Sequence, residues 1–235
     1  MIATTNDKHL DGFKNIPEFS SFQGRFDMIP FPYLLLPTQE EKIYHKDLKA
    51  IEKVKKITPH SLEYLCRWAV MTRLKQPDPE LYPKEYRPLL HKLDPQSKIQ
   101  LFENESMQPR FTRKEQAEIK EIREKIWQES EGMAVYEGRF GASPREIRVI
   151  LFRAAQNKNH EELTPMAIFE ELHFITKNRT LYDFLQFEPR GSYHDNDLFI
   201  KTLTKQFIEQ FQKESIEAMA LAEHDKYEAL LTRYV

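Results

Sequence analysis

The sequence predicts a mainly α-helical chain that begins with a fragment of strand and an irregular stretch. Three observations support this prediction. Only 6 of the 235 residues are glycine, and the many Glu, Lys, Leu and Ile residues favour helices over an all-β fold. Apolar residues recur at helical spacing along most of the chain. The 14 prolines fall mostly between those periodic segments, an order that suits the end of an α/β domain followed by a helical subdomain.

The first residues are expected to form the end of a short strand. This strand covers residues 1–5, which indicates that the chain starts inside a domain. Residues 7–37 are predicted to be irregular, because Asp-Gly, Ile-Pro and Leu-Pro pairs interrupt regular structure. Thr38 then precedes an acidic first turn that includes Glu40, and a helix is predicted from there to about residue 56.

The rest of the chain is predicted to be a series of helices. Thr58 is expected to cap the next helix, with Pro59 as its first residue. A proline-rich connector follows over 76–111, and Thr112 and Glu115 form a capping box after it. The remaining helices are predicted over about 112–134, 144–157, 165–177, 180–187 and 197–235.

The last predicted helix carries an apolar stripe. We expect this stripe to be buried in the same fold, although it is also compatible with an interaction surface. Its members are Leu203, Phe207, Phe211, Ile216 and Met219.

Composition excludes several classes of function. The formal net charge is −2, from 35 basic and 37 acidic side chains, so neither nucleic acid nor an anionic membrane is expected as a partner. No apolar run approaches the roughly 20 residues that span a bilayer. The single cysteine, Cys66, is expected to be a buried thiol in a cytoplasmic protein. The eight histidines lack metal-ligand spacing, so no metal site is expected in the chain.

One predicted helix start carries the strongest chemical signal. Ser143 is its N-cap, Pro144 its first residue, and Glu146 at the third position completes a capping box. Arg145 at the second position opposes the helix dipole, at a cost of about 0.3–1 kcal/mol when exposed. Free backbone N–H groups beside a guanidinium suit phosphate. Alternatively, Arg145 pairs with Glu137 or Glu146 and only holds the fold together.

The sequence around this helix start resembles a known family. Gly-Ala-Ser-Pro-Arg is similar to the sensor-2 motif of several AAA+ ATPase groups, and the wider string over 136–147 resembles the PrkA serine protein kinases. The resemblance implies that Arg145 reaches from a helical lid to the terminal phosphates of ATP and that Ser143 takes part in nucleotide binding. Further segments similar to this family are 19–27, 32–35, 40–44, 151–157, 163–165, 169–172, 182–185 and 193–195.

The front of the chain resembles the same family. Asn6, after Thr4-Thr5, is similar to sensor 1, and its amide offers a donor and an acceptor that suit a water near the γ-phosphate. Arg25 occupies the place of an arginine finger, which sets positive charge against the phosphoryl transition state across a subunit interface. The resemblance therefore implies that Asn6 and Arg25 are catalytic. For Arg25 the alternative is a local pair with Asp27.

The resemblance also implies three regions. Residues 1–37 would be the end of an AAA+ α/β core, with sensor 1 and the arginine finger. Residues 38–111 would be a first helical lid segment with a proline-rich connector. Residues 112–235 would be the helical lid with sensor 2 and C-terminal PrkA-like helices. No Gly-x-x-x-x-Gly-Lys-Ser/Thr loop occurs in the sequence, so we expect an excised or truncated piece, or one half of a split protein.

These observations lead to one functional prediction and one alternative. The chain is predicted to be part of an ATP-dependent PrkA-type serine protein kinase or AAA+ ATPase of the bacterial type. The parent would use ATP and Mg²⁺, act on a protein substrate and form a homo-oligomer. The segment alone is expected to be inactive, and kinase chemistry follows from the family name, since no His-Arg-Asp or Asp-Phe-Gly signature occurs. The alternative is a non-catalytic helical protein-interaction module derived from an AAA+ lid.

Overall fold

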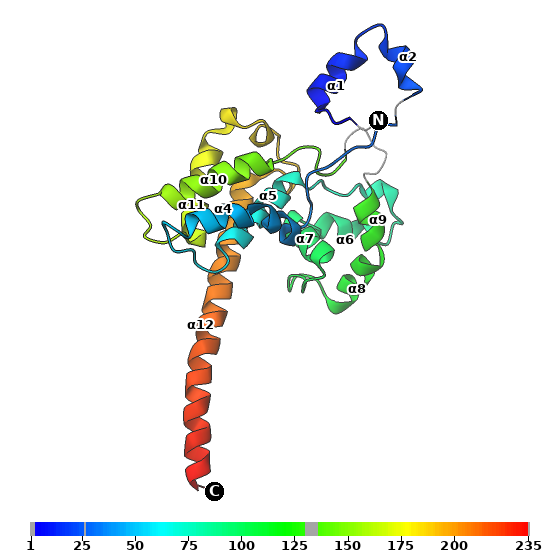
Figure 1. Cartoon of the computed structure of the whole chain (residues 1–235). Coiled ribbons are helices and arrows are strands. Elements are labelled where there is room, and N and C mark those ends of the chain that lie inside the picture. Colours follow the sequence, from blue (N-terminus) through cyan, green and yellow to red (C-terminus); the bar gives the residue numbers. More distant parts are fainter. Residues whose placement is uncertain (1–2, 26, 130–135, 235) are drawn as a thin grey trace. The chain divides into compact units, whose positions relative to one another are not determined.

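The computed structural model of the chain describes residues 3–25, 27–129 and 136–234 (Figure 1). Side chains of the last helix are described as far as Met219. The chain divides into two compact units, which are Met1–Phe31 (unit 1) and Pro32–Val235 (unit 2). The structure confirms the prediction of a mainly α-helical chain.

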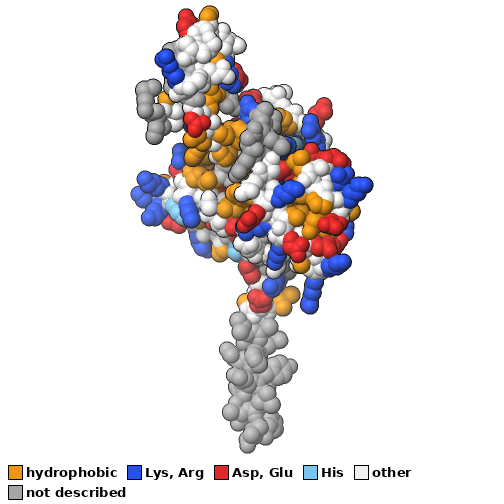
Figure 2. Space-filling view, turned by 90° about the vertical axis from the view of Figure 1, so that its right-hand side faces the viewer, with side chains coloured by type: hydrophobic (Ala, Val, Ile, Leu, Met, Phe, Trp, Pro, Cys, Tyr) orange, Lys and Arg blue, Asp and Glu red, His pale blue; other side chains and the backbone are white. Residues whose placement is uncertain are grey.

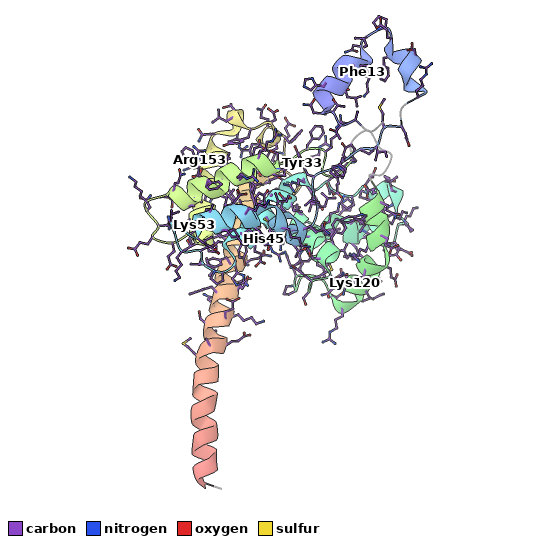
Figure 3. The ribbon with its side chains drawn as sticks, in the orientation of Figure 1. Phe13, Tyr33, His45, Lys53, Lys120 and Arg153 are labelled. Carbon is purple, nitrogen blue, oxygen red and sulfur yellow. The ribbon has the colours of Figure 1, made fainter. Side chains whose placement is uncertain are left out.

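Unit 1 contains two short helices, α1 (Asp7–Lys14) and α2 (Phe19–Gln23), so the prediction that residues 7–37 are irregular was wrong over these two segments. The rings of Phe13, labelled in Figure 3, and Phe19 meet edge to face, with centroids 5.3 Å apart. This aromatic contact joins the end of the first helix to the start of the second.

The strand expected at the front of the chain is not seen in its described residues. Residues 3–5 have no regular structure, so the prediction was wrong there, and residues 1–2 lie outside the described part. A strand needs a neighbour to satisfy its backbone groups. In the part of the chain that the structure describes, β pairing is limited to two isolated bridges, Ile57 with Leu163 and Arg190 with Tyr193.

Unit 2 is built from helices joined by short loops. They are α3 (Pro37–Glu40), η1 (Glu41–Tyr44), α4 (His45–Ile51), α5 (Ser61–Arg73), η2 (Pro79–Leu81), α6 (Arg87–Lys92), α7 (Pro95–Glu103), α8 (Arg113–Glu121), α9 (Arg123–Gln128), α10 (Pro144–Gln156), α11 (Pro165–Lys177), η3 (Arg179–Leu181), η4 (Asp183–Leu185) and α12 (Asn196–Tyr234).

Helix α5 is the centre of unit 2. Of its 13 residues, 11 are buried, which is the pattern of a helix surrounded by other helices. It packs against α3, α7, α10, α11 and α12, and Figure 1 shows it in the middle of the helical body. Its last two residues, Thr72 and Arg73, are buried and contact the loop that precedes α10.

Helices α10 and α11 begin where the sequence predicted. Ser143 caps the first, and Thr164 caps the second by accepting a hydrogen bond from the Ala167 N–H over 3.1 Å. Both caps place proline at the first helical position. Because such signals act within one helical turn, they set the start of each helix without help from the rest of the fold.

Four other predicted helices have different bounds. The helix predicted to reach about residue 56 ends at Ile51, as α4. Thr58 does not cap α5, because its hydroxyl donates to the Leu163 carbonyl 3.2 Å away and the helix begins only at Ser61, after His60. The helix predicted over 112–134 is divided at Ile122, whose N–H bonds back to the Ile119 carbonyl; residues 130–134 lie outside the described part. The helix predicted over 180–187 is replaced by η3 and η4.

The apolar stripe of α12 is buried only at its beginning. Leu203 is buried and Phe207 packs partly against the core, whereas Phe211, Ile216 and Met219 are 60–61% exposed. Burial of the whole stripe was therefore a wrong prediction. The helix extends beyond α5 and α11, with which its first part packs (Figure 1).

The surface of unit 2 mixes charges of both signs. In Figure 2, basic and acidic side chains are interspersed over the visible face of the helical body, in keeping with the formal net charge of −2. None of the described helices is long and apolar enough to cross a membrane.

Candidate functional site

The loop before α10 and the first turn of that helix form the candidate site. The Ser143 hydroxyl accepts a hydrogen bond from the Glu146 N–H over 3.3 Å. In return, the Glu146 carboxylate accepts one from the Ser143 N–H over 2.6 Å. The predicted capping box is therefore confirmed.

Arg145 lies in the first turn of α10 with its side chain exposed. The two carboxylates that were its alternative partners have other roles. Glu137 pairs with Lys98, and Glu146 closes the capping box. Within the described residues Arg145 makes no ion pair. Its charge opposes the helix dipole, whereas the Glu146 carboxylate in the same turn favours it.

Two glycines shape the loop that leads to this helix. Gly138 has φ +74°, and a Cβ there would lie 2.6 Å from the Tyr33 carbonyl oxygen. Gly141 has φ +117°, and a Cβ there would lie 2.6 Å from Cγ of Arg73 and 2.9 Å from the Thr72 carbonyl oxygen. Positive φ and close backbone approach both require glycine. The loop therefore lies directly against the end of α5.

A buried ion pair holds the last residue of the loop. The side chains of Arg73 and Glu40 are both 0% exposed and pair over 2.7 Å. Arg73 also donates to the Ala142 carbonyl from Nε (2.9 Å) and Nη2 (2.8 Å). The Ala142 N–H donates to the Thr72 hydroxyl over 2.9 Å. Both backbone groups of the residue before the N-cap are thus bonded to the end of α5.

The aromatic hydroxyl of Tyr44 completes the surroundings of Glu40. It donates a hydrogen bond to the Glu40 carboxylate over 2.6 Å. Burial, together with this hydrogen bond, raises the pKa of Tyr44 well above its usual range. The buried carboxylate of Glu40 is therefore satisfied by Arg73 and Tyr44 together.

A second buried ion pair holds the beginning of the loop. Glu137 and Lys98 pair, with side chains 4% and 2% exposed. Glu137 also accepts from the Lys75 N–H over 2.7 Å, and Lys98 donates to the Lys75 carbonyl over 2.8 Å. Both ends of the loop are thus attached to the core of unit 2 through desolvated charges.

The anchoring roles of these residues were not predicted from the sequence. Glu40 was interpreted as part of an acidic first turn, and Arg73 was not singled out at all. Two features of the sequence indicated that the loop and Arg73 are special. Gly138 and Gly141 place two of the six glycines within four residues. Arg73 ends a helix whose other residues are nearly all apolar or buried, where an unpaired charge would be costly.

The structure places the other predicted site residues in unit 1. Asn6 caps α1, and its side-chain oxygen accepts from the His9 N–H over 3.0 Å. Arg25 is exposed. No ion pair between Arg25 and Asp27 is found in the described residues. Asn6 and Arg25 therefore belong to unit 1, while Ser143 and Arg145 belong to unit 2.

Other side chains that could be reactive have structural roles. Cys66 is fully buried, and burial raises the pKa of its thiol, which disfavours the reactive thiolate. Asp195 directly precedes α12 and accepts from the Leu198 N–H over 2.9 Å, the bond that a helix N-cap makes. Burial and nearby Arg190 lower the pKa of His194. Among the described residues, no three His, Cys, Asp or Glu side chains are grouped to hold a metal ion.

Comparison with known families assigns the chain. The model of the "PrkA serine protein kinase C-terminal domain" matches residues 96–235, more than half of the chain. The chain belongs to the PrkA family. The model of the "PrkA AAA domain" matches residues 1–80 of this PrkA chain. The resemblance found in the sequence is therefore confirmed.

One curated PrkA relative aligns with the whole chain. It is the "ATP-dependent protease PrkA" of Bacillus subtilis (strain 168), which is 21% identical over 239 residues. The alignment covers 100% of this chain and 33% of the relative, so the PrkA chain spans about a third of that protein's length. No solved structure matches the chain.

Proposed function

We propose that this PrkA chain supplies sensor and lid residues to an ATP site whose Walker motifs lie upstream. Arg145 contacts the terminal phosphates of ATP, and Ser143 shapes the helix start that presents it. ATP and Mg²⁺ bind in the complete protein, where the magnesium ion neutralises phosphate charge. Residues 1–37 belong to the AAA+ core in this proposal, 38–111 to the first lid segment, and 112–235 to the lid and its C-terminal helices.

The exposed side chain of Arg145, which makes no ion pair within the described residues, is the observation that supports this proposal most. A cation in the first turn of a helix is unfavourable, and no described carboxylate pairs with it. Stability of the fold therefore does not explain an arginine at this position. An anion at the start of α10 would relieve the unfavourable charge, because the guanidinium and the backbone N–H of Arg145 would both face it. Pro144 has no N–H, and the N–H of Glu146 already donates to Ser143.

In unit 1, we assign catalytic roles to Asn6 and Arg25. The Asn6 side-chain oxygen is used by the cap of α1, which leaves its amide N–H₂ as a donor to a water or a phosphate oxygen. Arg25 is exposed and, as an arginine finger, acts on the ATP site of a neighbouring subunit in a homo-oligomer. Both residues stabilise the negative charge of the phosphoryl transition state.

The reaction that uses ATP is proposed to be transfer of the γ-phosphoryl group to a serine hydroxyl of a protein substrate. This follows the family name, whereas the Bacillus subtilis relative is named a protease. ATP dependence is the property common to the AAA domain and the name of the relative. An assay that follows both ³²P transfer to protein and cleavage of that protein distinguishes the two reactions.

The decisive test compares Arg145→Ala with Arg148→Ala in a full-length PrkA protein that contains this segment. Arg148 lies on the same helix and pairs with Asp47 over 2.8 Å, so it is a matched control. We expect Arg145→Ala to reduce the rate of ATP hydrolysis by about tenfold or more, as for loss of a donor to the transition state. Equal activity of the two variants would refute the sensor role of Arg145.

The exposed part of α12 favours a second function as a protein-interaction module. Phe211, Ile216 and Met219 are 60–61% exposed, and apolar groups on a surface favour contact with another protein. In this alternative the isolated chain is a stable, folded monomer without nucleotide, and Arg145→Ala has no effect on its activity in the cell. Sedimentation and thermal unfolding with and without ATP test the first expectation.

A further inference from the structure

We propose that Arg73, with Glu40 and Thr72, is a positioning residue for Arg145 and couples the start of α10 to the segment that follows unit 1. This inference rests on the proposed function of Arg145. It goes beyond that proposal because none of the three residues belongs to a sensor motif, and because Arg73 and Ala142 are 69 positions apart in the chain.

Ala142 joins the end of α5 to the start of α10. Its carbonyl accepts two hydrogen bonds from Arg73, and its N–H donates to Thr72. Ala142 directly precedes the N-cap Ser143, so its backbone determines the direction in which α10 begins. Arg145 follows three positions later in the first turn. The end of α5 therefore sets the position of the Arg145 backbone.

The residues that follow unit 1 contact both Arg73 and the loop before α10. Arg73 Nη1 donates to the Leu34 carbonyl over 2.8 Å, and its guanidinium lies 5.2 Å from the centre of the Tyr33 ring. The Tyr33 N–H donates to the Gly138 carbonyl over 2.8 Å. Figure 3 shows Tyr33 near the start of α10 and Arg153 further along that helix. A displacement of Tyr33 and Leu34 is thus transmitted to the loop before α10.

Only arginine has enough N–H donors for the hydrogen bonds that Arg73 makes here. Its guanidinium has five N–H groups in a planar fork. Here Nε and Nη2 donate to Ala142, Nη1 donates to Leu34, and Nη1 and Nη2 donate to the two oxygens of Glu40. All five are used, so lysine can replace the charge of Arg73 but not its geometry.

The test is a double-mutant cycle on ATP hydrolysis in a full-length PrkA protein that contains this segment. We expect Arg73→Lys to lower kcat by about tenfold to a hundredfold, as for an ångström-scale displacement of a catalytic group. In the Arg145→Ala background, Arg73→Lys is expected to have no further effect, because the group that it positions is already absent. Arg67→Lys is the control, since Arg67 lies on α5 and pairs with Glu63 and Glu105.

Each outcome of the cycle has a separate meaning. Equal losses from Arg73→Lys in both backgrounds would mean a purely structural role and would overturn the inference. If Arg145→Ala has no effect, the proposed function fails, and amide hydrogen exchange then tests the positioning alone. The inference requires faster exchange over residues 138–147 in Arg73→Lys, with residues 165–168 at the start of α11 unchanged. Uniform acceleration, or none, refutes it.

A milder variant covers the possibility that Arg73→Lys does not fold. Thr72→Val keeps the shape of the side chain and removes the acceptor of the Ala142 N–H. We expect the same exchange pattern over residues 138–147 and the same dependence on Arg145 in ATP hydrolysis, with smaller amplitude. An unchanged exchange rate at Ala142 in a folded Thr72→Val protein counts against the inference.

Discussion

The two regions that contain the candidate residues are held in place by different kinds of contact. The loop before α10 is attached to α5 and α7 through residues that lie 39 to 70 positions away in the chain. In unit 1, the described hydrogen bonds of α1 and α2 join residues no more than four positions apart, such as Asn6 with His9 and Ser21 with Glu18. The start of α10 is thus positioned by the tertiary fold, whereas the start of α1 is positioned by hydrogen bonds within its own first turn.

The difference between distant and local contacts has a consequence for the polar and charged residues of each region. Arg73 and Glu40 are fully buried and depend on each other, whereas Asn6 and Arg25 are exposed and depend little on distant residues. We therefore expect substitutions near α10 to alter the stability of unit 2, and those in unit 1 to have local effects. Substitutions in the two regions should therefore differ in the size and reach of their effects.

Removal of one member of the buried ion pair should cause the largest loss. Arg73→Met leaves the Glu40 carboxylate buried with Tyr44 as its remaining partner. We expect a decrease in the free energy of unfolding of about 3–5 kcal/mol, the usual cost of an uncompensated buried charge. Urea unfolding measures it. The double variant Arg73→Met with Glu40→Leu should recover much of the loss, and failure to recover would show that the hydrogen bonds to Ala142 dominate.

A methyl group at Gly141 should cost somewhat less. Gly141→Ala combines a strained positive φ with a Cβ placed 2.6 Å from Arg73, for which we expect a loss of about 3 kcal/mol. Gly12→Ala is the contrasting variant. Gly12 lies inside α1 with nothing within 4 Å of an added Cβ, so alanine should stabilise that helix by about 0.5–1 kcal/mol. Losses of equal size in both variants contradict the contrast between the regions.

The two N-caps allow a closer comparison. Ser143→Ala and Asn6→Ala each remove one side-chain acceptor, at a cost of about 1 kcal/mol to the helix concerned. For Ser143 the loss should appear in the global unfolding of unit 2, because α10 belongs to its core. For Asn6 it should appear as faster amide exchange in α1 alone. Circular dichroism and hydrogen exchange, measured on both variants, separate the two results.

The smallest effect is expected at Arg145 and has the opposite sign. Arg145→Ala removes a cation from the first turn of α10, so the free energy of unfolding should rise by about 0.3–1 kcal/mol. A gain in stability combined with a loss of ATP hydrolysis would mark Arg145 as a residue kept for function. Salt reduces the gain if it is electrostatic. A loss of stability would instead indicate a structural partner for this side chain.

The sequence predicted those features that depend on neighbouring residues. Ser143 with Glu146 and Thr112 with Glu115 form their capping boxes as expected, since each box is closed within one turn. Prediction from the sequence failed where the outcome depends on residues far away in the chain. Thr58 was expected to cap a helix, but its hydroxyl bonds to the Leu163 carbonyl, 105 positions away. Phe211 was expected to be buried, but α12 extends past the helices that would cover it.

By itself, then, the sequence determined the mainly helical fold, the start of α10 and the family to which the chain belongs. Capping and helical periodicity are local, and family motifs are strings of residues. Only the tertiary structure decided that Glu40 is buried against Arg73 and that Arg73 holds Ala142, 69 positions away. Contacts of this kind form only when the chain closes long loops around a common core, and no local pattern encodes which distant partner will be there.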